Sequence, residues 1–331
     1  MTASRTEPAP TSANPEQIAL LRKAVDEVGR RIVGQSAMID RLMIGLMTGG
    51  HILLEGVPGL AKTMAVRTLA DILRASFSRI QFTPDLLPAD IVGTMVFDPK
   101  TQEFHPKRGP LFANIVLADE INRAPAKVQS ALLEGMQEHQ VSIGGETYHL
   151  PEPFLVLATQ NPIESEGTYP LPEAQLDRFL LKVRVSYPSR GEEREILQRM
   201  STADPITVTP LLDPETVLSL RQVVLNTHLD PRLADYIVDL VRATREPASV
   251  GLGALTSLVA FGASPRASIA LAQAARAHAV LQGRGYVTPH DIQALAPDVM
   301  RHRIVLTFEA EAEDVTSDSI VSQVVERVKV P

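Results

Sequence analysis

The sequence predicts an α/β protein with a parallel-sheet core, two hairpin insertions and a smaller, all-helical domain after the core. Three observations support this: short apolar runs alternate with helical patterns, a glycine-rich turn follows the first run, and helical periodicity dominates after about residue 190. Strands that alternate with helices form parallel sheets. We therefore expect a disordered tail at 1–13, the α/β core at 14–190, and a linker with the helical domain at 191–331.

Five short apolar runs are the predicted strands of the core. They are HILLEG (51–56), FSRIQF (77–82), ANIVLAD (113–119), PFLVLAT (153–159) and FLLKVRV (179–185). The segments 93–106 and 141–150 interrupt the alternation, and each is predicted to form a hairpin. The second turns on Gly144-Gly145, because glycine tolerates the positive φ that a two-residue turn requires.

Composition excludes several classes of function. The 331 residues suffice for two domains, and 44% hydrophobic and 21% charged residues are typical of a soluble globular protein. A net charge of −7 gives no general attraction to nucleic acid, and the absence of cysteine excludes disulfides and thiolate chemistry. No apolar run approaches 18 residues, so we expect no membrane span and a cytoplasmic protein.

The strongest local motif is GVPGLAKT, residues 56–63, between the first predicted strand and a helical pattern. Phosphate binding needs backbone N–H groups at a helix N-terminus, a lysine for the β and γ oxygens, and a hydroxyl for Mg²⁺. Lys62 and Thr63 supply the last two. Ala61 departs from the general P-loop pattern, which has glycine before the lysine, but its methyl costs little if the residue has helical φ.

Two further strands end in polar residues. Asp119 is the last residue of the run ANIVLAD, and Glu120 follows it directly. Strand alternation predicts that their side chains point in different directions. The carboxyl ends of parallel strands meet beside the P-loop, so Asp119 can hold the metal's water shell while Glu120 acts as general base. Asn161 follows the next strand and can orient the attacking water or contact the γ-phosphate.

Three arginines are candidates for contacts with phosphate. Arg266 lies in the first turn of a predicted helix, where the helix dipole disfavours a cation by roughly 0.3–1 kcal/mol, so an anion is expected nearby. Arg178 and Arg123 are both candidates for an arginine finger supplied to a neighbouring subunit. The residues themselves do not separate these two.

With these motifs in order, the chain resembles the MoxR family of AAA+ ATPases. Its members carry sequences similar to EGVPGLAKT, LADEINRAP, ATQNPIE and LPEAQLDRF, and the resemblance covers nearly everything from Ile32 to Phe308. Four motifs agree in order and spacing. Alanine before the P-loop lysine is usual in this family.

The resemblance implies roles for individual residues. Asp119 and Glu120 would form Walker B, Asn161 sensor 1, Arg266 sensor 2 and Arg178 the arginine finger. The expected metal ligands are Thr63 and Asp119. The expected nucleotide-binding residues are Ile32, Val33 and Gly34 at the adenine, and Gly56, Val57, Pro58, Gly59, Leu60, Ala61, Lys62, Thr63 and Met64 at the phosphates.

The resemblance also implies how the protein works. It suggests hexameric rings that hold ATP and Mg²⁺ between subunits, with the two hairpins facing the pore or a partner. Relatives often act with von Willebrand factor A domain proteins to mature other protein complexes. Two alternatives stay open: a nucleotide-dependent assembly scaffold with little turnover, and a DNA-acting motor, against which the acidic balance argues.

Overall fold

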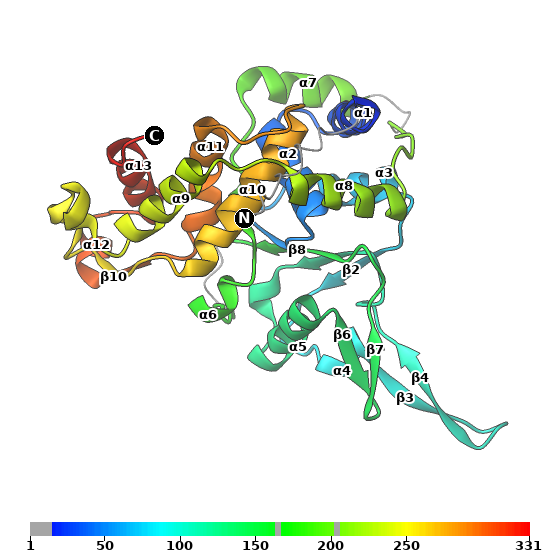
Figure 1. Ribbon diagram of the computed structural model, residues 1–331. Helices are drawn as coiled ribbons and strands as arrows, with labels where there is room; N and C mark the ends of the chain where they lie inside the picture. The colour runs from blue at the N-terminus through cyan, green and yellow to red at the C-terminus, as the bar shows by residue number, and fades with distance from the viewer. Residues whose placement is uncertain (1–14, 163–166, 202–205) are drawn as a thin grey trace, which may run out of the picture. The chain divides into compact units, whose positions relative to one another are not determined.

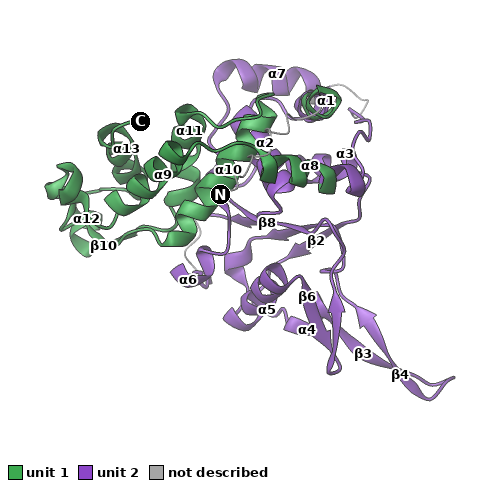
Figure 2. Ribbon diagram, in the orientation of Figure 1, with its two compact units in different colours: residues 1–22, 218–331 green, residues 23–217 purple. Residues whose placement is uncertain are grey.

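The computed structural model describes residues 15–162, 167–201 and 206–331. The chain forms two compact units: residues 23–217, and residues 218–331 with the described part of 1–22 (Figure 2). The division falls within α1 (Pro15–Arg31). The boundary predicted at residue 190 comes before the division between residues 217 and 218, and it lies at the start of α7 (Arg190–Met200). The predicted tail at 1–13 and the first residue of the predicted core, 14, lie outside the described residues.

The first unit, residues 23–217, contains a parallel sheet of five strands in the order β2-β5-β8-β1-β9, of which β2 and β8 are labelled in Figure 1. All four neighbouring pairs are parallel, which confirms the predicted core. The order brings together strand ends that are distant in sequence: Gln81 lies opposite Asp119, and Glu55 opposite Gln160. The strand bounds are β1 Ile52–Glu55, β2 Phe77–Gln81, β5 Ile115–Asp119, β8 Leu155–Gln160 and β9 Leu181–Arg184.

Helices cover this sheet because the central strands are apolar on both faces. Every residue of β5 is buried, as expected for a strand in the middle of a parallel sheet. One core joins the strand residues Val116 and Val156 to Leu132 and Met136 of α5. The helices of this unit, besides part of α1, are α2 Ser36–Thr48, α3 Lys62–Ile72, α4 Pro88–Val92, α5 Ala126–Glu138, α6 Glu173–Leu176 and α7.

Both predicted hairpins are confirmed. The first pairs β3 (Gly93–Asp98) with β4 (Glu103–Arg108), and every residue of β4 is exposed. The second pairs β6 (Gln140–Ile143) with β7 (Glu146–His149). Its turn uses Gly144 and Gly145 at φ +62° and +89°, the positive values for which glycine was expected.

A buried histidine fixes the start of β1. His51 accepts a hydrogen bond at Nδ1 from the N–H of Val156 (3.0 Å) and donates one from Nε2 to the carbonyl oxygen of Met136 (3.0 Å). Because a backbone N–H only donates and a carbonyl only accepts, these partners require the neutral Nε2–H tautomer. The side chain thus ties β1 to β8 and α5.

The second unit is helical apart from one short sheet. Its sequence did not indicate strands, yet β10 (Val259–Phe261) pairs with β11 (Val305–Leu306) in an antiparallel arrangement. The other elements are α8 Pro214–Asn226, which begins before the division, α9 Pro231–Ala243, α10 Pro265–Leu281, α11 Pro289–Met300, α12 Phe308–Ala312, α13 Ser317–Arg327, and the 3-10 helices Pro247–Val250 and Gly253–Leu255. Within the described ranges, no helix is long and apolar enough to cross a membrane.

A buried carboxylate joins α10 to α11 in this second unit. Asp291 has no exposed surface and accepts hydrogen bonds from His278 Nδ1 (2.6 Å), both terminal nitrogens of Arg284 (2.6 and 2.7 Å) and the backbone and hydroxyl of Thr288 (2.7 Å each). Burial raises the pKa of Asp291, but these hydrogen bonds outweigh it and hold that pKa well below the ordinary value.

Candidate functional site

The glycine-rich turn joins β1 to α3, the helix that starts at Lys62. Gly59 has φ of +86°, so the turn uses glycine's access to the left-handed region. Ala61 has φ of +58°, which means that the helical φ considered for this residue is wrong. A left-handed conformation costs an L-residue roughly 1–2 kcal/mol, so Ala61 stores strain directly before Lys62.

The side chain of Lys62 folds back over the turn. Its ammonium group donates a hydrogen bond to the carbonyl oxygen of Gly56. Burial lowers the pKa of Lys62, while the charges of Asp119, Glu120 and Glu55 offset part of that effect. An anion beside the ammonium group would favour its charged form, so this site is suited to phosphate.

Asp119 ends β5 with its carboxylate held on two sides. The hydroxyl of Thr159 donates to Oδ1 (2.6 Å), and Arg79 donates to Oδ2 from Nε (3.1 Å) and Nη2 (2.6 Å). Asp119 is only 8% exposed and Thr159 only 1%. Thr159 is near the end of β8, and Arg79 is on β2, so three neighbouring strands position this one carboxylate.

Glu120 directs its carboxylate to the same place by leaving the strand. Strand alternation predicted that it would point away from Asp119, but its φ of 56° and ψ of 51° are left-handed, and both acids line one pocket. The N–H of Glu120 donates to the Thr159 hydroxyl (2.8 Å). Its Oε2 accepts from Gln81 (3.0 Å) and pairs with Arg123 (2.9 Å).

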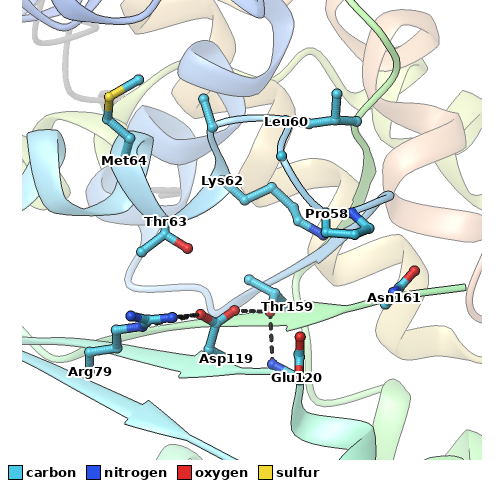
Figure 3. Close-up of a pocket in the computed structure, with 12 residues that line it drawn as sticks. Pro58, Leu60, Lys62, Thr63, Met64, Arg79, Asp119, Glu120, Thr159 and Asn161 are labelled. Atoms are coloured by element: carbon cyan, nitrogen blue, oxygen red, sulfur yellow. Dashed lines mark hydrogen bonds and ion pairs between the residues drawn. The ribbon is translucent and has the colours of Figure 1, made fainter. Parts of the chain in front are cut away.

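A pocket of about 420 Å³ collects these groups (Figure 3). Four elements contribute: the turn with the first residues of α3, Arg79 of β2, and the ends of β5 and β8 (Figure 3). Among the described residues, the lining is Pro58, Gly59, Leu60, Ala61, Lys62, Thr63, Met64, Arg79, Asp119, Glu120, Thr159 and Asn161. The structure thus brings together the predicted P-loop, both acids and Asn161.

Other predicted site residues lie outside this lining. Gly56 and Val57 precede it in the turn, and Ile32, Val33 and Gly34 lie between α1 and α2. Ile32 and Val33 are 2% and 9% exposed. Their predicted contact with the adenine stays a prediction.

The three arginines have different surroundings. Arg123 pairs with Glu120 of its own chain, whereas Arg178, after α6, donates to the carbonyl oxygen of Leu133 (2.7 Å). Arg266 belongs to the second unit, where its N–H donates to the side chain of Ser264, the N-cap of α10. Its contact with phosphate stays a prediction.

Sequence reasoning missed three residues at this site: Arg79, Gln81 and Thr159. Thr159 stands two positions before Asn161, so its place at the end of the same predicted strand was a usable signal. Arg79 and Gln81 lie on the same face of β2, and only the pairing of β2 with β5 brings them to the acids. No local pattern in the sequence indicates that pairing.

Two family profiles match the two parts of the chain. Residues 51–181 match the ATPase family associated with various cellular activities (AAA), and residues 255–324 match the AAA lid domain. The first match includes the turn, both acids and Asn161. Fold, site and profiles together define an AAA ATPase.

Individual relatives identify the family within that class. The chain is 52% identical to Chaperone MoxR1 of Mycobacterium tuberculosis, over 95% of this chain and 83% of the relative. It is 49% identical to protein YeaC of Bacillus subtilis, over 94% of this chain and 95% of the relative. A solved structure from Cytophaga hutchinsonii, described as a candidate ATPase, is 50% identical to the chain, with a TM-score of 0.90 and coverage of 96% of each chain. Proteins named MoxR from Methylorubrum extorquens and Paracoccus denitrificans match at 32% and 34% identity. The chain belongs to the MoxR family of AAA+ ATPases, as the motifs implied.

Proposed function

We propose that this ATPase cleaves the β–γ phosphoanhydride bond of ATP in the pocket of Figure 3. Lys62 and the N–H groups at the start of α3 hold the phosphates, and Glu120 accepts a proton from the attacking water. Asn161 orients that water. The observation that carries the proposal is the convergence of a lysine at a helix N-terminus, two carboxylates and an amide in one pocket of about 420 Å³.

The predicted metal ligands suit Mg²⁺. The hydroxyl of Thr63 is drawn above the carboxylate of Asp119 in Figure 3, and both offer the hard oxygen atoms that this ion takes together with phosphate oxygens and water. The ion would neutralise charge on the transferred phosphoryl group. Thr159 keeps Oδ1 of Asp119 in place, so the orientation of this ligand is fixed before the ion arrives.

We place the complete site at the interface between subunits of a homo-oligomeric ring, with six subunits by family resemblance. Arg178 would serve the neighbouring subunit as the arginine finger. Arg123 forms an ion pair with Glu120 of its own chain, whereas Arg178 donates to a backbone carbonyl, that of Leu133, and the weaker neutral contact favours Arg178 for a role in trans. Arg266 of the second unit would contact the phosphates, so that hydrolysis shifts the helical unit.

The output of the cycle would be the remodelling or maturation of a partner protein complex. The exposed hairpin β3–β4, with Phe97 and Phe104 at 48% and 64% exposure, offers a surface for such a partner. We also propose that a von Willebrand factor A domain protein acts together with this ATPase and that the protein is cytoplasmic. Both proposals rest on the family resemblance. A scaffold with slow turnover is the second candidate.

Complementation between inactive variants tests this proposal. Glu120→Gln removes the base, and Arg178→Ala removes the finger but leaves its own pocket intact. If the finger acts in trans, mixing the two variants creates interfaces with both groups, and ATPase activity rises above the sum of the separate variants. Arg123→Ala, mixed in the same way, is the control for the competing arginine. A gain with Arg123→Ala alone would make Arg123 the finger, and no gain with either arginine variant would refute the interface site.

Two further measurements separate hydrolysis from scaffolding. Wild-type turnover should rise with protein concentration, and Lys62→Ala should abolish nucleotide binding. Slow turnover at every concentration, with assembly that still responds to ATP, would favour the scaffold. Affinity capture with Glu120→Gln, which retains bound ATP, would then identify the partner.

A further inference from the structure

Arg79 and Asp119 both line the pocket of Figure 3 and form an ion pair there. Nε and Nη2 of Arg79 both donate to Oδ2, while Thr159 donates to Oδ1. A carboxylate offers roughly four lone-pair directions, and these donors take three of them. Figure 3 shows the guanidinium end of Arg79 beside the carboxylate of Asp119, with Thr63 drawn above them.

The two partners of Asp119 differ in how easily they can leave. Thr159 is 1% exposed and also accepts the N–H of Glu120, so its hydroxyl is fixed. The Arg79 side chain is 51% exposed and extends from β2, an edge strand of the sheet. Because water reaches the Arg79 end of this ion pair, replacing the guanidinium by another cation costs less than breaking a fully buried pair, whose loss leaves a buried charge without a partner.

Charge balance makes this exchange selective. Among the described residues that line the pocket, Lys62 and Arg79 balance Asp119 and Glu120. With Arg79 on Asp119, a bare divalent cation meets a site that is already neutralised. A nucleotide brings several negative charges, which give the released guanidinium a new partner while the metal takes Oδ2.

From these contacts we infer that Arg79 acts as an exchangeable counter-ion for Asp119. In the nucleotide-free pocket, Arg79 weakens the binding of divalent cations to Asp119. When a cation enters together with a nucleotide, the guanidinium moves to the phosphates, and the cation binds Oδ2 of Asp119. The inference rests on the proposed metal site at Thr63 and Asp119. It adds a device that couples metal binding to nucleotide binding.

Binding of Mn²⁺ to the nucleotide-free protein tests the inference without any turnover. Free Mn²⁺ is measured by electron paramagnetic resonance for wild type, Arg79→Gln and Arg79→Lys. We expect Arg79→Gln to bind Mn²⁺ about fivefold more tightly than wild type and Arg79→Lys to lie between them. If Arg79 merely orients Asp119 as a ligand, Arg79→Gln binds Mn²⁺ more weakly, and the inference is overturned.

Arg184→Gln is the matched control. Arg184 also lies on an edge strand, β9, is also 51% exposed, and also pairs with an acid that is 12% exposed, Glu55. Its removal changes the net charge equally but leaves Asp119 untouched, so Mn²⁺ affinity should stay within about twofold of wild type. An equal gain in both variants would reduce the effect to general charge and overturn the inference.

A second readout uses a non-hydrolysable ATP analogue with and without metal. Arg79→Gln should weaken binding in EDTA, because the phosphates lose a cation, and should raise the ratio of affinity with Mg²⁺ to affinity without it. An unchanged ratio contradicts the exchange. Asp119→Asn in the Arg79→Gln background should cancel the gain in Mn²⁺ affinity; if it does not, the metal site itself is wrong, and the proposed function fails at that point.

Discussion

Thr159 is the side chain on which both acids of the site depend. Its hydroxyl donates to Oδ1 of Asp119 at 2.6 Å and accepts the N–H of Glu120 at 2.8 Å. Thr159→Val keeps the shape of the side chain and removes both bonds. The substitution therefore tests whether this one hydroxyl positions the metal ligand and the base.

The expected loss of stability follows from those two bonds. A hydrogen bond to a charged group is worth about 1.5–3 kcal/mol, and a buried N–H left without a partner costs about 1–3 kcal/mol. Asp119 lines an open pocket, where water can replace part of the lost bond, so we expect a total of about 2–4 kcal/mol. Glu120, held in a left-handed conformation at φ 56°, loses one of the contacts that maintain it.

Urea denaturation and steady-state ATPase kinetics measure the two effects. We expect Thr159→Val to lower kcat about tenfold to a hundredfold, since both acids lose their orientation, and to change KM much less. Thr68→Val is the matched control, because Thr68 has no exposed surface but donates only to the Met64 carbonyl within α3. A kcat for Thr159→Val within twofold of that control would refute the reasoning.

Three other substitutions have defined outcomes. Ala61→Gly removes the left-handed strain at φ +58°, worth roughly 1–2 kcal/mol, and glycine's greater freedom when unfolded offsets only part of that gain, so urea denaturation should show stabilisation of up to about 1 kcal/mol. His51→Leu leaves the Val156 N–H and the Met136 carbonyl unpaired and should cost about 2–5 kcal/mol; no loss would contradict the assigned hydrogen bonds. Asp291→Asn should cost about 3 kcal/mol at neutral pH. Because the folded-state pKa of Asp291 is lowered, its contribution is complete above its unfolded pKa of about 3.9 and is lost as pH falls, so acid titration should destabilise wild type more than the variant.

Local patterns in the sequence predicted the elements and the chemistry of the turn. Short apolar runs gave the five strands because a buried parallel strand must be apolar on both faces. Gly144 and Gly145 marked the second hairpin, because its turn needs positive φ. Lys62 and Thr63 were identifiable because phosphate binding requires those groups next to a helix start. Each of these features depends on residues close together in the chain.

Other features depend on contacts between distant segments, and only the tertiary structure decided them. The strand order places β2 beside β5, so Arg79 reaches Asp119, 40 positions later in the chain. The left-handed backbone at Ala61 and Glu120 likewise depends on how the turn and the strand end are held, and the alternation rule gave the wrong direction for Glu120. The chain by itself determined which chemical groups are available, because residue types and local spacing fix them. Which groups meet in the pocket was decided by strand pairing, because pairing depends on packing of the whole sheet.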